Sequence, residues 1–172
     1  LINGELVESK RTLDVTNPST GKVIRQVADA NAADVERAIT AAQEAFPAWR
    51  DTPPAKRAQV MYRFKQLLEE NANRLVQLVS EEHGKTPEDA MGELKRGIEN
   101  VEYACGVPEL LKGEYSHNVG PGIDAWSNFQ PLGVVVGITP FNFPAMVPLW
   151  MYPMAIACGN TFILKPSEKD PS

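Results

Sequence analysis

The amino-acid sequence predicts a mixed α/β protein that combines small β-hairpins, a run of helices and one parallel strand–helix–strand unit. The turn-forming segments NG (3–4) and NPSTG (17–21) have strand residues beside them. Between residues 31 and 105, helix-start signals precede apolar residues at helical spacing. The strongest observation is the pair of apolar runs LGVVVGI (132–138) and TFILK (161–165). An apolar helix lies between them, so the two strands should be parallel with a right-handed crossover.

Composition and net charge limit the kinds of molecule that this chain is expected to bind. The chain has 172 residues, is 43% hydrophobic and 23% charged, and has a net charge of −5. These values are ordinary for a globular protein and argue against nucleic acid or an anionic membrane as partners. We find no targeting segment, and prolines and glycines interrupt the most apolar stretch, so we expect a cytoplasmic, bacterial-type protein without a membrane span. Cys105 and Cys158 lack metal-ligand spacing, so we expect no metal site.

Four helices are predicted between the hairpins and the parallel unit. Each begins at a capping residue or a proline, Gly84 is suited to end the third, and Pro108 should kink or end the fourth. The start signals are Asn31 with Asp34, Thr52 with Pro53, Asn71 or Asn73, and Thr86 with Pro87 and Asp89. The residues expected to face the core are Val35, Ala38, Ile39, Ala42 and Phe46; Val60, Phe64, Leu67 and Leu68; Leu75, Leu78 and Val79; and Ala90, Leu94, Val101, Ala104 and Cys105.

The segment 113–131 is polar and turn-rich, and it becomes extended near Trp126 and Phe129. This pattern fits an edge strand or an interface strand. The run 132–138 then has no polar alternation, as in a strand that is buried on both faces.

The rest of the parallel unit is predicted from its boundaries. Residues 144–158 form an apolar helix, in which Pro153 should produce a kink and Gly159 with Asn160 should end the helix. The strand 161–165 follows, and Pro166 ends it.

Ligands in open α/β sheets bind beyond the carboxyl ends of the strands. Two segments occupy that position here, ITPFN (138–142) and KPSE (165–168), so both are candidate site loops. The GxGxxG fingerprint of common dinucleotide folds is absent, because Gly133 and Gly137 precede or lie within the strand. A nucleotide would therefore be held differently at this loop.

Two side-chain groups in these loops each allow two interpretations. Asn142, between Pro140 and Pro144, is either a preorganised donor to an oxyanion or a cap for the following helix. Lys165 and Glu168 either grip the hydroxyls of a ribose or form a local ion pair near a helix start at Ser167 or Asp170. Spacing alone favours the structural role in both cases.

Other candidates lie on helices. Arg96 is either a ligand for an anionic substrate or a solvated surface residue, and Trp150 is either pocket wall or core. His83 and His117 lack partners at useful spacing and are expected at the surface. Cys158 is expected to be a packed, inert thiol.

Taken together, PLGVVVGITPFNFPAMVPLWMYPMAIACGNTFILKPSE (131–168) resembles the aldehyde dehydrogenase superfamily. The shared pattern is P-x-G-V, a P-x-N-F-P loop, a helix that contains tryptophan, A-x-x-x-G-N and K-P-S-E. INGE, NPSTGKVI, AAQEAFPAW and HGKTPEDAMGE extend the likeness over the whole chain. Within the superfamily, KRGIENVEYACGVPELLKGEYSHNV and TPFNFPAMVPLWMYPMAIACGNTF resemble most the CoA-acylating methylmalonate-semialdehyde dehydrogenases.

The resemblance implies roles for individual residues. Asn142 matches the amide of the family's oxyanion hole, and Thr139 and Phe141 match positions that line the cofactor. Lys165 and Glu168 match the pair that holds the adenosine ribose of NAD, with Lys169 near enough to contribute, and Glu168 would repel the 2′-phosphate of NADP. Arg96 and Trp150 match positions beside the substrate tunnel, where the arginine suits the carboxylate of malonate or methylmalonate semialdehyde.

The implied reaction begins with attack of a cysteine thiolate on the aldehyde. Hydride passes to NAD, the thioester loses its carboxylate as CO2 or bicarbonate, and CoA takes the acyl group as propionyl-CoA or acetyl-CoA, consistent with valine or inositol breakdown. Neither Cys105 nor Cys158 matches the nucleophile's motif. We therefore expect this chain to be an N-terminal fragment whose catalytic domain lies beyond Ser172, and to be inactive alone.

The family resemblance also divides the chain. Residues 1–115 would form strands and helices of the NAD-binding domain, 116–131 an oligomerisation segment, and 132–172 the first βαβ unit of the Rossmann-like domain. The full-length protein would be a homo-oligomer, a dimer or a tetramer. The alternatives are a hydrolytic NAD-dependent aldehyde dehydrogenase of other substrate range and a non-catalytic binding or assembly module.

Overall fold

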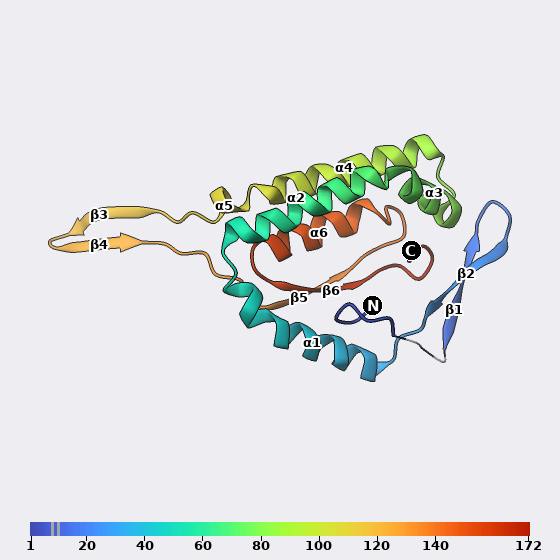
Figure 1. Cartoon of the computed structure of the whole chain (residues 1–172), viewed down its shortest axis with the longest axis horizontal. Helices are drawn as coiled ribbons and strands as arrows, with labels where there is room; N and C mark the ends of the chain where they lie inside the picture. Colours follow the sequence, from blue (N-terminus) through green and yellow to red (C-terminus); the bar gives the residue numbers. More distant parts are fainter. Residues whose placement is uncertain (8, 10) are drawn as a thin grey trace.

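The predicted α/β architecture is confirmed in a computed structural model that describes residues 1–7, 9 and 11–172. A pair of parallel strands lies between one helix on one side and a layer of helices on the other (Figure 1). The strands are β5 (Val134–Ile138) and β6 (Thr161–Lys165), the single helix is α1 (Ala32–Arg50), and the layer begins with α6 (Met146–Ala157). Outside α6 lie α2 (Pro54–Glu70), α3 (Ala72–His83), α4 (Pro87–Cys105) and the short α5 (Val107–Leu110).

The N-terminal hairpin consists of β1 (Thr12–Asn17) and β2 (Lys22–Ala28), which pair antiparallel across the predicted turn. The hairpin packs against the end of α3, where Pro18 lies beside Gly84. Gly84 has a φ of +86° and ends α3 as predicted, a conformation that disfavours a side chain. The NG turn at 3–4 is also confirmed, because Ile2 and Glu5 pair across it.

Local start signals predict three helix boundaries correctly and one incorrectly. Asn71 directly precedes α3, although its side chain forms no capping hydrogen bond. Asn31 and Asp34 form a complete capping box at α1, and the Thr86 hydroxyl accepts the N–H of Asp89 at α4. The predicted cap at Thr52 is wrong, since α2 begins at Pro54 and the Thr52 hydroxyl instead donates to the Ala48 carbonyl. α1 continues to Arg50, and this hydroxyl satisfies one of the carbonyls at its end.

The predicted buried face is confirmed in full for α4, where the five apolar residues predicted to face the core are all buried. It is wrong in part for α2, where Val60 and Leu67 are 47% and 42% exposed, Phe64 and Leu68 are half-buried against the core, and the buried residues are Arg57, Ala58 and Met61. The buried face of α2 differs from the predicted one because Arg57 donates to the Ala157 carbonyl at the end of α6 (Nε–O 2.8 Å). This bond places the side of α2 that carries Arg57 towards α6.

The other two helices bury less than predicted. No residue of α1 is buried, and Val35 is 50% exposed. In α3, Val79 is buried as predicted, whereas Leu75 and Leu78 are half-buried because Val76 is the residue that faces α4.

The parallel pairing of β5 and β6 is confirmed, in register from Val134 opposite Thr161 to Ile138 opposite Lys165. Burial of β5 on both faces is not observed, since Val136 and Ile138 are 59% and 71% exposed. Within the described residues this sheet has two strands, so part of each strand remains uncovered. α6 continues through Pro153 and is followed by Gly159 with a φ of +97°, as its C-terminal signal predicts.

The predicted extended segment forms a hairpin of β3 (Tyr115–Gly120) and β4 (Ile123–Trp126), which projects from the rest of the chain (Figure 1). Pro108 lies within α5, after α4 has ended at Cys105. Across the described part of the chain, no helix combines the length and the apolar character that a membrane crossing requires.

Candidate functional site

The two predicted site loops lie side by side. β5 and β6 end at the same edge of the sheet because they are parallel, and the Thr139 N–H donates to the Lys165 carbonyl just beyond that edge (N–O 3.1 Å). Thr139 is 5% exposed. The backbone therefore fixes the start of one loop to the start of the other.

The side chains of the second loop form an open, charged surface. Lys165 and Glu168 are paired (Nζ–Oε2 3.1 Å), and both side chains are 56% exposed. The backbone N–H of Glu168, and then Lys165, lower the pKa of the Glu168 carboxyl, which stays ionised at neutral pH. The local ion pair considered from the sequence is thus present, but its exposure leaves both groups accessible to a ligand.

Phe141 and Lys169 link the two loops. The Lys169 ammonium lies 3.9 Å from the centre of the Phe141 ring, a cation–π contact. The Ser167 hydroxyl accepts the N–H of Lys169 (3.1 Å), so it forms a local turn, and no helix follows within the described residues. The structure therefore brings together all five residues predicted to line a cofactor.

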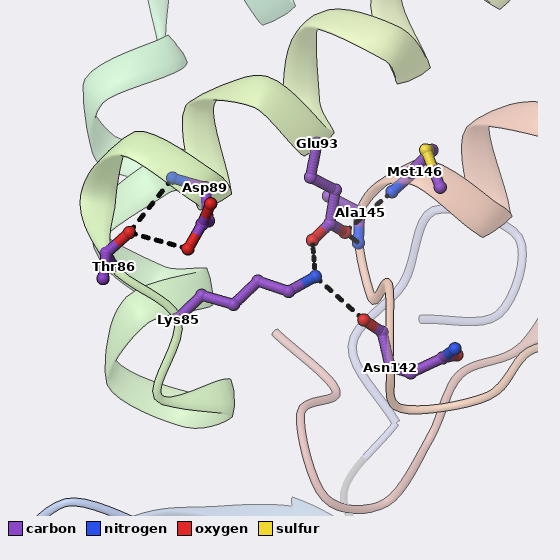
Figure 2. A network of polar contacts seen from close by, with 7 residues as sticks. All are labelled: Lys85, Thr86, Asp89, Glu93, Asn142, Ala145 and Met146. Carbon is purple, nitrogen blue, oxygen red and sulfur yellow. Dashed lines mark hydrogen bonds and ion pairs between the residues drawn. The ribbon is translucent and has the colours of Figure 1, made fainter.

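Asn142 does not cap α6, so that interpretation is wrong. The residue before the helix is Ala145, and the N–H groups of Ala145 and Met146 donate to one oxygen of Glu93 (2.8 and 3.1 Å). The exposed Asn142 side chain points away from this contact (Figure 2), and no hydrogen bond to its amide is formed by any residue that the structure describes. Its two N–H donors are therefore available to another molecule.

A buried ion pair behind this loop was missed in the sequence. Lys85 and Glu93 have side chains that are 14% and 1% exposed, and Lys85 also donates to the Asn142 carbonyl (2.8 Å; Figure 2). One signal could have revealed it. Glu93 falls on the apolar stripe of α4 beside Ala90 and Leu94, where a carboxylate requires a partner.

Arg96 and Trp150 are both exposed and lie about one helical turn from the Asn142 loop. Glu93 of α4 contacts the first residues of α6, and one turn later Gly97 contacts Leu149. Arg96 and Trp150 directly adjoin that second contact. Their places beside a path towards Asn142 and their roles towards a substrate stay predictions.

The cysteines do not resemble nucleophiles. Burial raises the pKa of both thiols, and the Cys105 thiol donates to the Val101 carbonyl within its own helix. The surface assignment holds for His117, which pairs with Asp124, but not for the half-buried His83, whose pKa is lowered by burial. In the described ranges 1–7, 9 and 11–172, no group of three or more His, Cys, Asp or Glu side chains is placed to hold a metal ion.

Comparison with known proteins identifies the family of this chain. Residues 6–172 match the aldehyde dehydrogenase family. The chain belongs to that family. The N-terminal part of the aldehyde dehydrogenase fold, predicted from the motifs at 131–168, is thereby confirmed.

Among its curated relatives, this aldehyde dehydrogenase chain is 74% identical to malonate-semialdehyde dehydrogenase of Pseudomonas aeruginosa, over 100% of this chain and 35% of the relative. It is 50% identical to the mitochondrial, acylating methylmalonate-semialdehyde dehydrogenase of Arabidopsis thaliana, over 99% of this chain and 28% of the relative. The chain thus spans about a third of the length of these relatives.

Solved structures agree in fold. The methylmalonate-semialdehyde dehydrogenase DddC of Oceanimonas doudoroffii superposes with a TM-score of 0.97 at 68% identity, over 100% of this chain and 36% of that one. A Sinorhizobium meliloti protein assigned to the methylmalonate-semialdehyde dehydrogenases, in complex with NAD, gives a TM-score of 0.95 at 49% identity, over 99% and 35%.

Proposed function

We propose that the full-length protein containing this chain oxidises malonate or methylmalonate semialdehyde with NAD and transfers the acyl group to CoA. The observation that supports this most is the free amide of Asn142, held at one strand exit beside the charged loop of the other. The names of relatives that are 74% and 50% identical supply the substrate class.

In this proposal Asn142 is a catalytic residue. Attack on an aldehyde carbonyl places negative charge on its oxygen, and a preorganised N–H donor stabilises that charge by about 3–4 kcal/mol in the transition state. The amide of Asn142 is free to donate, while its backbone carbonyl is held by Lys85. The nucleophilic thiolate and the general base would come from the remainder of the full-length protein, since the pKa of both thiols here is raised.

The strand-exit loops fit the adenosine end of NAD. An ionised Glu168 can accept hydrogen bonds from ribose hydroxyls, and Lys165 can donate to them, because both side chains are half-exposed at the end of β6. Phe141 and Lys169 would border the same surface. When bound, NAD supplies the acceptor for the aldehyde hydride, and the S. meliloti neighbour is itself a complex with NAD.

Arg96 is proposed to bind the carboxylate of the substrate, and Trp150 to line the approach to Asn142. Both are exposed in this chain and lie on adjacent helices one turn from the loop. An arginine pairs a carboxylate through two parallel hydrogen bonds, which would select a semialdehyde with an acid group over an uncharged aldehyde.

The acyl acceptor decides between the CoA-dependent reaction and the hydrolytic alternative. The name of the A. thaliana relative includes acylation, whereas that of the P. aeruginosa relative does not. The test is NADH formation by the full-length protein from malonate semialdehyde, with and without CoA. Turnover that requires CoA and yields acetyl-CoA supports the proposal, whereas turnover independent of CoA would leave a hydrolytic enzyme.

The same assay addresses the proposal that this chain alone is inactive. Residues 1–172 without the remainder of the protein should form no NADH under any of these conditions. If the full-length protein also formed none with any aldehyde, a non-catalytic binding or assembly role would replace the enzymatic one.

We also infer that the β3–β4 hairpin joins subunits into a dimer or tetramer. Four large apolar or aromatic side chains of the hairpin are each at least 58% exposed in this chain: Tyr115, Val119, Ile123 and Trp126. Apolar surface of this kind is typical of a contact with another protein. Light scattering on full-length protein with Val119→Asp and Ile123→Asp tests this. An unchanged molar mass would remove the hairpin from the interface.

A further inference from the structure

We propose that Lys85 and Glu93 are positioning residues for Asn142, which they hold through its own backbone carbonyl and through the N–H groups of Ala145 and Met146, three and four positions later. This inference rests on the proposed oxyanion role of Asn142. Lys85 lies just before α4 and Glu93 lies within it, and their contacts reach a segment more than 50 positions later in the sequence (Figure 2).

Glu93 fixes the end of the loop. One carboxylate oxygen accepts the N–H groups of Ala145 and Met146, at 2.8 and 3.1 Å, where α6 begins. These are among the N–H groups that a helix leaves without partners, and Ala145 has no capping side chain of its own. A carboxylate at the positive end of the α6 dipole is favourable, so Glu93 serves as the missing cap.

Lys85 fixes the middle of the loop. Its ammonium donates to the second Glu93 oxygen at 2.5 Å and to the Asn142 carbonyl at 2.8 Å, and it lies 3.9 Å from the centre of the Phe143 ring. One cation thus contacts two consecutive residues of the loop. These contacts hold the Asn142 backbone but leave its amide unused.

The two charges depend on each other. The Glu93 side chain is 1% exposed, and a carboxylate so buried is costly without a cation. Removing one partner of a buried pair leaves an uncompensated charge, which would relax towards water. A substitution that removes the charge of Lys85 or of Glu93 should therefore shift the loop. A displacement of about 1 Å at a reacting group can lower the rate roughly 100-fold.

The test is a double-mutant cycle in the full-length enzyme, with Lys85→Met and Asn142→Ala separately and together. We expect kcat to fall about 100-fold for Lys85→Met and about 100-fold to 1,000-fold for Asn142→Ala. The double variant should be no slower than Asn142→Ala alone, because Lys85 acts through Asn142, and KM for NAD should change less than twofold throughout. If the role of Lys85 were purely structural, the fold losses in kcat of the two single variants would multiply in the double variant. That result would overturn the inference.

Two further variants sharpen the result. Glu93→Gln keeps an acceptor oxygen for the two N–H groups. If Lys85→Met does not fold, Glu93→Gln replaces it in the double-mutant cycle with Asn142→Ala. Arg57→Met is the matched control, because Arg57 is a buried cation that binds the opposite end of α6, and its effect on kcat should add to that of Asn142→Ala. If Asn142→Ala itself left kcat unchanged, the oxyanion proposal would fail first, and the positioning role with it.

Discussion

Gly97 of α4 lies so close to Leu149 of α6 that a Cβ at position 97 would approach Cδ1 of Leu149 to 2.5 Å and its Cβ to 3.2 Å. Leu149 is 4% exposed, so its side chain has little space in which to move away. This contact sets the separation of the two helices one turn beyond the Asn142 loop. The absence of a side chain at Gly97 is therefore a requirement of the packing.

Gly97→Ala should destabilise the full-length protein, because overpacking of a core contact costs about 1–3 kcal/mol and exceeds the gain of about 1 kcal/mol from alanine in a helix. Thermal unfolding measures the effect. Gly92→Ala in the same helix is the matched control, since nothing lies within 4 Å of a Cβ there, and it should raise the melting temperature. Equal melting temperatures for the two variants would contradict the packing argument.

Arg96→Ala should weaken binding of acidic substrates selectively. Loss of a charged hydrogen-bonding partner should raise KM for malonate semialdehyde about 10-fold or more, an effect of roughly 1.5–3 kcal/mol. KM for an uncharged aldehyde such as propanal should stay within twofold. Lys95→Ala removes a neighbouring exposed cation and should change KM for neither substrate. Equal effects of Arg96→Ala on KM for both substrates would show that Arg96 is a solvated surface residue without a role in substrate binding.

Sequence signals were most accurate where the chain contacts itself locally. The capping box of Asn31 and Asp34, and the Thr86 cap, involve residues three positions apart, so the motif contains the whole interaction. The parallel pairing of β5 and β6 was also predictable, since two apolar runs joined by one helix allow little else.

Two of the errors have a common physical origin in contacts between distant segments. The inward face of α2 is set by the bond from Arg57 to Ala157, 100 positions away, which the spacing of Val60 and Leu67 does not reveal. Spacing alone favoured a cap at Asn142 because it shows the start of α6 but not Glu93, which lies 52 positions before Ala145. Asn142 could thus be proposed as a site residue from its motif, whereas the pair that contacts its loop could not.

Glu168 should determine the choice between NAD and NADP. Its carboxylate would accept ribose hydroxyls and repel a 2′-phosphate, so Glu168→Gln should lower kcat/KM for NAD and raise it for NADP. We expect the ratio of the two to fall about 10-fold or more, which corresponds to about 1.4 kcal/mol. Glu109→Gln disrupts another exposed pair at the same spacing, with Lys112, and should leave the ratio unchanged. An unaltered ratio in Glu168→Gln would remove Glu168 from the ribose site.

Asp170 should make the stability of the protein depend on pH. The residue is 5% exposed, one of its oxygens has no hydrogen-bond partner among the described residues, and burial raises its pKa from 3.8 to about 6. Between these values the folded state keeps a proton that the unfolded state has lost, so stability falls as the pH rises from about 4 to about 6 and stays reduced above that.

Asp170→Asn removes the ionisable group and should therefore stabilise the full-length protein at pH 8, by about 2 °C in melting temperature. At pH 4 the carboxyl of the folded state is protonated, so the variant and the unmodified protein should melt within about 1 °C of each other. Melting curves between pH 4 and pH 8 measure the difference, with Asp51→Asn as control. The pKa of Asp51 is lowered by its hydrogen bond to Arg50, so that variant should show no gain at high pH. A melting-temperature difference for Asp170→Asn that does not grow with pH would show that Asp170 is already ionised in the folded protein at pH 4.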